Sequence, residues 1–217
     1  MFFTANLKST KKLFSNKMRL GIYGGAFSPV HKAHVDMAKA FAESYDLDKL
    51  LIIPTGEAPH KHISEKVGTA ERLEMCKLAF TKIENAEISD IEIRREGKSY
   101  TVITLRELAD ANTEIFFLCG SDKIPTLERW YCIDEIFRLC TIVYVKRSGE
   151  NNNEDSKAEE YRAKYGAKID KLDACIEKIS SKDIRRCIEL GESISGLVPR
   201  SVETFIREKG LYLNKNI

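Results

Sequence analysis

Two histidines three positions apart, His31 and His34, follow a glycine pair, Gly24 and Gly25, in the segment GGAFSPVHKAH. Side chains at positions i and i+3 share a helical face, so a helix beginning after Pro29 would carry both imidazoles at its first turn. The unpaired backbone N–H groups and the dipole at such a helix start favour an anion. The segment therefore predicts a phosphate site.

A second segment with the same chemistry comes late in the chain, at Ile179 to Arg185 (ISSKDIR). Ser180 is a favourable N-cap residue, Asp183 follows three positions later, and Arg185 falls in the second turn. Hydroxyls, backbone N–H groups and two cations would thus gather at one helix start. Such a motif alone is weak evidence, but two of them in one chain strengthen the prediction of a phosphate ligand.

The segments that must position these residues alternate between strand and helix patterns. We predict strands at 19–23, 49–53, 114–119 and 141–146, with a further strand containing Ile88, Ile91 and Ile93. We predict helices at 32–44, 69–80, 101–109 and 201–209, the last one ended by Gly210. Residues 148–156 are predicted to form a polar loop, and a helical pattern resumes near Glu159.

This alternation indicates an α/β fold: a Rossmann-like, doubly wound, mainly parallel sheet in a single domain, covered by helices on both faces. Ligands of such folds lie beyond the carboxyl ends of the strands, where the strand order reverses. The segment that follows the first strand lies in the right place for this.

Composition narrows the function classes. A chain of 217 residues can bury one full core, and 35 basic against 33 acidic residues leave a net charge of +2. This balance argues against a nucleic-acid surface, and no apolar run approaches the ~20 residues that a membrane span needs. Six scattered cysteines without a C-x-x-C pair indicate a reduced, cytoplasmic protein. A catalytic cysteine is the alternative, although none lies beside a histidine.

Residues 1–17 carry several lysines and no acidic residue, and Met18 directly precedes the first predicted strand. We expect a disordered leader over 1–17 and the domain over 18–217. A transit peptide and an upstream start codon are the alternatives.

Taken together, the two motifs resemble those of the nucleotidylyltransferase superfamily, and specifically of bacterial nicotinate-nucleotide adenylyltransferases. The family's G-x-F-D-P-x-H-x-G-H is similar to Gly25–His34, and its I-S-S-T-x-I-R to Ile179–Arg185. Between them, four further matches occur in family order: Pro59-His60-Lys61, Ser99-Tyr100-Thr101-Val102, Gly120-Ser121-Asp122 and Trp130. The resemblance covers Met18 to Leu213.

The resemblance implies adenylyl transfer from ATP to nicotinate mononucleotide, giving deamido-NAD and pyrophosphate. It implies catalytic roles for His31, His34 and Arg185. The ATP-binding residues that it implies are Gly24, Gly25, Ala26, Phe27, His31, His34, Gly120, Asp122, Ile179, Ser180, Ser181 and Arg185. For the mononucleotide they are His60, Lys61, Tyr100, Thr101 and Trp130. Mg²⁺ would be bound through the ATP phosphates, without a metal site on the chain. A homo-oligomer is possible on this pattern.

Three positions depart from the family pattern: Ser28 replaces an aspartate, Ala33 a glycine, and Lys182 a threonine. Ala33 suits a helix, Ser28 can make a local turn hydrogen bond, and Lys182 adds a cation near the expected phosphates. The departures keep other hypotheses open. One is an adenylyltransferase for nicotinamide mononucleotide or another phosphorylated acceptor such as phosphopantetheine, and another is a nucleotide-binding regulator with weakened turnover. A tRNA-binding module fits less well, because the chain lacks a basic face.

Overall fold

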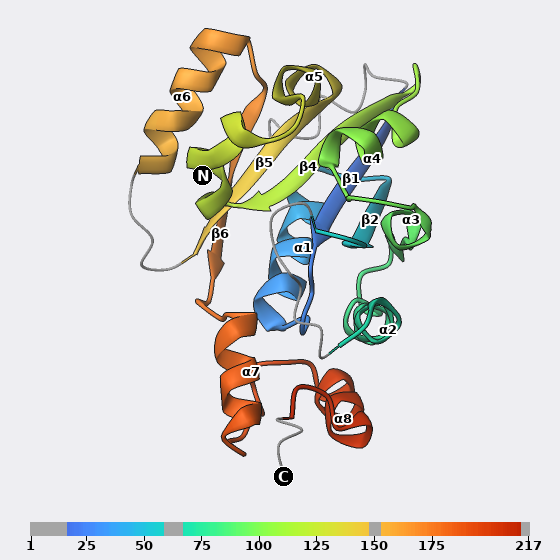
Figure 1. Cartoon of the computed structure of the whole chain (residues 1–217). Helices are drawn as coiled ribbons and strands as arrows, with labels where there is room; N and C mark the ends of the chain where they lie inside the picture. The colour runs from blue at the N-terminus through green and yellow to red at the C-terminus, as the bar shows by residue number, and fades with distance from the viewer. Residues whose placement is uncertain (1–16, 59–66, 148–152, 214–217) are drawn as a thin grey trace, which may run out of the picture.

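The sheet determines where the predicted site lies. The computed structural model describes residues 17–58, 67–147 and 153–213, and within them six strands form one parallel sheet in the order β3-β2-β1-β4-β5-β6 (Figure 1). The strands are β1 Met18–Gly25, β2 Lys49–Pro54, β3 Ala86–Ile88, β4 Thr113–Gly120, β5 Cys140–Arg147 and β6 Ile169–Ile176. Because the order reverses between β1 and β4, the predicted doubly wound topology is confirmed.

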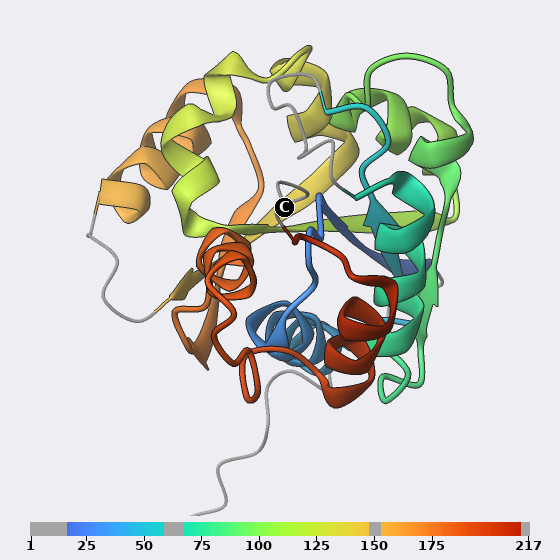
Figure 2. The ribbon, with the colours of Figure 1, turned by 60° about the horizontal axis from the view of Figure 1, so that its bottom comes forward.

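Helices cover both faces of the sheet. They are α1 Lys32–Ser44, α2 Thr69–Ala79, α3 Ile91–Arg94, α4 Thr101–Leu108, the 3₁₀ helix η1 Ser121–Arg129, α5 Ile133–Leu139, α6 Asn153–Tyr165, α7 Ser181–Glu189 and α8 Arg200–Lys209. Figure 2 shows α1, α7 and α8 on one side of the sheet and α4, α5 and α6 on the other. Successive strand side chains point to opposite faces, so Phe116 packs into one core and Phe117 into the other.

The predicted third strand is only partly correct. Only Ala86–Ile88 pairs with β2, whereas Ile91 and Ile93 lie in the short helix α3. The Arg94 N–H donates to the Asp90 carbonyl at 2.9 Å, and the two side chains form an ion pair. These local bonds favour a helical turn. A short apolar run in the sequence cannot by itself distinguish a strand from a helix.

Helix α6 begins at Asn153, earlier than the sequence predicted. The loop prediction for 148–156 is therefore wrong for residues 153–156, while 148–152 lie outside the described residues. Glu154 and Asp155 occupy the first turn, where acidic side chains interact favourably with the helix dipole.

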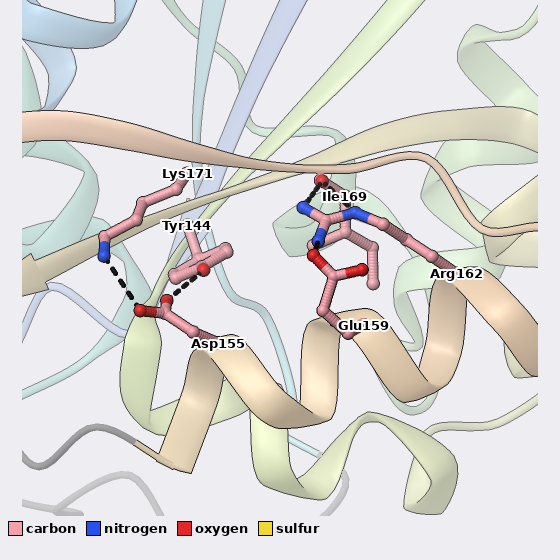
Figure 3. Close-up of polar contacts among 6 residues, drawn as sticks. All are labelled: Tyr144, Asp155, Glu159, Arg162, Ile169 and Lys171. Atoms are coloured by element: carbon pink, nitrogen blue, oxygen red, sulfur yellow. Dashed lines mark hydrogen bonds and ion pairs between the residues drawn. The ribbon is translucent and has the colours of Figure 1, made fainter.

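Helix α6 is attached to β5 and β6 by polar contacts (Figure 3). Asp155 accepts hydrogen bonds from the Tyr144 hydroxyl at 2.5 Å and from Lys171 Nζ at 3.0 Å. Arg162 Nε donates to the Ile169 carbonyl at 3.0 Å. Strand β6, like η1 and α5, had no counterpart among the sequence predictions. Its buried residues Ile169, Leu172 and Ile176 do not follow the two-residue period by which a half-buried strand is recognised.

None of the helices in the described ranges is long and apolar enough to cross a membrane. The residues of the predicted leader lie outside the described part of the chain, apart from Lys17.

Candidate active site

The first phosphate motif forms the turn from β1 into α1. The turn's positive φ falls on Phe27, at 46°, and not on Gly24 or Gly25. Position 25 favours glycine for lack of space, because a Cβ there would lie 3.0 Å from the Phe27 ring. That ring is buried and meets the Tyr23 ring edge-on, with centroids 5.4 Å apart. Aromatic packing therefore shapes the turn.

The two histidines lie together at the start of α1, as predicted. Their rings stack with centroids 3.6 Å apart and planes 22° from parallel. The His31 backbone N–H donates to His34 Nδ1 at 3.2 Å. An Nδ1 that accepts a hydrogen bond leaves the proton of a neutral imidazole on Nε2, so this contact assigns His34 the tautomer with an Nε2–H donor. His31 is 2% exposed.

The second motif begins α7, and its first turn is capped as predicted. Ser180 Oγ accepts from the backbone N–H groups of Lys182 at 3.1 Å and Asp183 at 3.4 Å. Ser181 Oγ donates to the Pro29 carbonyl at 2.9 Å. The start of α7 is thus bonded directly to the loop that carries the first motif.

Arg185 and Ser28 complete this junction. Arg185 Nη1 donates to the Ser28 carbonyl at 2.6 Å. The Ser28 hydroxyl shares a hydrogen bond of 3.1 Å with the Tyr212 hydroxyl, which replaces the local turn bond expected from the sequence. Burial raises the pKa of Tyr212 to about 12. Gly210 ends α8 in the left-handed conformation, as predicted, and the chain then reaches Tyr212.

A cavity of about 440 Å³ opens at the carboxyl ends of β1 and β4, where the strand order reverses. Among the described residues of its wall, Lys123, Lys182 and Arg185 are cations, and Asp122 is the one carboxylate. Asp122 itself pairs with Lys123 at 2.5 Å. The lining of the cavity also includes Gly24, Gly25, Ala26, Phe27, His31, His34, Gly120, Trp130, Ser180 and Ser181. This is a site for a strongly anionic ligand.

A smaller cavity of about 120 Å³ adjoins the first and shares Gly24, Gly25, Phe117 and Trp130 with it. The Trp130 and Phe117 rings meet edge-on, with centroids 5.9 Å apart. Thr101 lines this cavity, whereas Tyr100 is not among its lining residues and contacts the Tyr131 ring.

A buried carboxyl group lies in the smaller cavity. Glu92 is 8% exposed and accepts a hydrogen bond from Thr104 Oγ1 at 2.8 Å. Burial raises the pKa of Glu92, and the hydrogen bonds from Thr104 and Ser99 partly offset this effect.

Most of the predicted residues come together, with four exceptions, one of which is Tyr100 outside the wall of the smaller cavity. Ile179 lies in the hydrophobic core and does not line either cavity. His60 and Lys61 lie outside the described residues. Lys123 and Glu92 line the cavities but were not predicted from the sequence. Lys123 directly follows the match Gly120-Ser121-Asp122, whereas Glu92 lies seven positions before Ser99.

The described side chains of the larger cavity offer few ligands to a divalent cation. Within the described ranges, no three His, Cys, Asp or Glu side chains are grouped so that they could hold a metal ion. Asp122 is the one carboxylate on the described wall of the larger cavity, and Lys123 already pairs with it.

The fold and the paired cavities define a nucleotide-binding α/β protein, and its similarity to known proteins specifies the class. The cytidylyltransferase-like family matches residues 22–187. Probable nicotinate-nucleotide adenylyltransferases are similar over nearly the whole chain. That of Clostridium botulinum (strain Kyoto / Type A2) is 38% identical over 88% of this chain and 97% of its own length. That of Geobacter sp. (strain M21) is 35% identical over 91% of this chain and 99% of its own length.

Among solved structures, the Plasmodium falciparum nicotinic acid mononucleotide adenylyltransferase complexed with NaAD has the same fold. It aligns with a TM-score of 0.75 at 17% identity and covers 89% of this chain and 97% of that one. The chain belongs to the nicotinate-nucleotide adenylyltransferases of the cytidylyltransferase-like family.

Proposed function

We propose that this protein transfers the adenylyl group of ATP to nicotinate mononucleotide and releases pyrophosphate. The observation that carries the proposal is the pair of adjoining cavities at the strand switch point, which share the walls formed by Gly24, Gly25, Phe117 and Trp130. The larger cavity has the cations that a triphosphate needs, and the smaller one has room for part of an acceptor. The named activity of the relatives supports the same assignment.

The reaction demands little proton transfer from the protein. A phosphate monoester has a second pKa near ~6, so the mononucleotide phosphate is largely dianionic at neutral pH. One of its oxygens forms a bond to the α-phosphorus of ATP, while the bond to the bridging oxygen breaks and pyrophosphate leaves with those electrons. Catalysis then consists of bringing two anions together and stabilising charge on the leaving group.

The geometry suggests how the residues divide this work. His34 offers an Nε2–H donor because Nδ1 is occupied by the His31 backbone. We assign His31, His34 and Arg185 to the ATP phosphates as donors and charge stabilisers. We assign Gly24, Gly25, Ala26, Phe27, Gly120, Asp122, Ser180 and Ser181 to ATP binding. Ile179 supports the start of α7 from the core.

The acceptor is assigned to the smaller cavity and its surroundings, with Thr101 and Trp130 on its wall and Tyr100 beside it. His60 and Lys61 are proposed for the mononucleotide phosphate on their sequence match alone. Mg²⁺ bound to the ATP phosphates would neutralise part of their charge. We further propose that the protein acts in the cytoplasm, in line with its six free cysteines.

Pyrophosphate release measured with ATP and each acceptor tests the proposal. We expect the highest kcat/KM with nicotinate mononucleotide, a lower value with nicotinamide mononucleotide, and no release with phosphopantetheine. A higher value for the amide would overturn the acid preference. Nucleotide binding without release from any acceptor would instead support the regulator hypothesis.

A further inference from the structure

A guanidinium group lies buried behind the two loops that line the cavities. Arg72, on α2, is 1% exposed. Its Nη1 donates to the Ala26 carbonyl at 2.9 Å, and its Nη2 donates to the Thr55 carbonyl at 2.7 Å. Nη2 also lies 3.5 Å from the Gly56 carbonyl. The side chain therefore connects the loop after β1 with the loop after β2.

These two loops belong to different cavities. Ala26 lines the larger cavity, whereas Thr55 lines the smaller one. The loops also bond to each other, since the Thr55 N–H donates to the Gly25 carbonyl at 2.9 Å. Gly56 continues the network, because its N–H donates to Ser99 Oγ at 3.1 Å. A chain of hydrogen bonds thus runs from one binding site to the other through Arg72.

The charge of Arg72 is unusual for such a buried place. Burial lowers its pKa, but arginine stays protonated in proteins. Among the described residues, its hydrogen-bond partners are carbonyl oxygens, and no carboxylate is among the groups that shift its pKa. A planar fork with fixed donors suits two carbonyls from different loops, in a way that a lysine ammonium does not.

We propose that Arg72 is a positioning residue that sets the distance between the two substrates by holding the Ala26 and Thr55 loops in register. The inference rests on the proposed function, because this spacing matters only when both substrates react with each other. Reacting atoms must approach to about 3–3.5 Å, and a misplacement of about 1 Å can cost on the order of 10²-fold in rate.

Two variants separate this role from simple binding. Arg72→Lys keeps a cation but loses the fork, and Arg72→Met keeps much of the volume but has no donor. We expect kcat to fall about 10- to 100-fold in both, with each KM within about threefold of the wild-type value. Circular dichroism at the assay temperature verifies that the variants are folded. A kcat within about twofold of wild type in both folded variants overturns the proposal.

The matched control is Lys77→Met on the same helix. Lys77 is more than half exposed and pairs with Glu74 at 3.4 Å. The Lys77→Met variant loses a cation from α2 but no hydrogen bond to either loop, so its kcat should equal that of the wild type. A fall in kcat like that of the Arg72 variants would attribute the effect to α2 as a whole and overturn the specific role of Arg72.

A measurement on the wild-type protein decides the matter if the variants do not fold. The buried guanidinium protons of Arg72, identified by NMR contacts with Ala26 and Thr55, should shift when ATP alone or nicotinate mononucleotide alone is added. If neither ligand shifts these signals, the proposal is overturned. Wild-type turnover is assayed separately, and its absence would contradict the proposed function. The NMR shifts would still decide whether the environment of Arg72 changes when either cavity is occupied.

Discussion

The hydroxyl groups of Ser28 and Tyr212 lie 3.1 Å apart, although 184 positions separate them in the chain. Ser28 belongs to the first phosphate motif, and its carbonyl is bonded by Arg185 of the second. The C-terminal segment therefore supports the junction between the two motifs.

Replacing Tyr212 by phenylalanine should destabilise this junction. The change removes one partner of a buried hydrogen bond, so we expect a loss of about 1–2 kcal/mol in the free energy of unfolding. The KM for ATP should rise about two- to fivefold, because Ser28 lines the larger cavity, which we assign to ATP. Urea unfolding and steady-state kinetics measure the two effects. Tyr165→Phe is the control, since its hydroxyl bonds Glu128 at an exposed site. Equal stability of the two variants would contradict the expectation.

Replacing His34 by alanine should lower kcat. The change removes the Nε2–H donor that we assign to the phosphates, and loss of one such preorganised donor costs about 10²- to 10³-fold. Initial rates at saturating ATP and mononucleotide provide the measurement. Lys39→Ala changes an exposed position on the same helix and should leave kcat unaltered. If His34→Ala retains kcat within about twofold, His34 has no part in the chemical step.

Restoring the family residue at position 182 tests whether the extra cation contributes to ATP binding. Lys182 lines the larger cavity, so Lys182→Thr should raise the KM for ATP about three- to tenfold and weaken its dependence on salt. We expect a smaller change in kcat. Lys178→Thr, an exposed lysine just before the motif, is the matched control. A lower KM in Lys182→Thr would mean that the lysine hinders binding.

Glu92 should make folding stability depend on pH. Burial raises the pKa of Glu92 above its ordinary value of 4.5, so the folded protein holds this proton more tightly than the unfolded chain. The stability linked to this proton is fully present below about pH 4.5 and is lost as the pH rises through the folded-state value.

In Glu92→Gln this loss is absent, while the amide oxygen can still accept from Thr104. We therefore expect the stability of the variant relative to wild type to increase between about pH 4 and pH 7 in urea unfolding experiments. Glu84→Gln, at an exposed position, serves as the reference for the change in net charge. A stability difference that does not vary with pH would refute the role given to Glu92.

Local signals in the sequence determined much of the fold. The cap at Ser180, the helix end at Gly210 and the start of α1 after Pro29 were all predictable, because each depends on residues a few positions away. The same holds for the alternation of apolar strands and helices, and hence for the place of the site at the carboxyl ends of the strands. The residue types of the two motifs also indicated a phosphate ligand.

The tertiary structure alone decided which atoms hold the site together. No local pattern shows that Arg185 bonds the Ser28 carbonyl, that Tyr212 reaches the Ser28 hydroxyl, or that Arg72 joins two loops. These contacts join elements that are distant in the chain and become neighbours only when the sheet is assembled. Burial follows the same rule, because an arginine in a helix pattern is ordinarily exposed, and only packing by several elements encloses it.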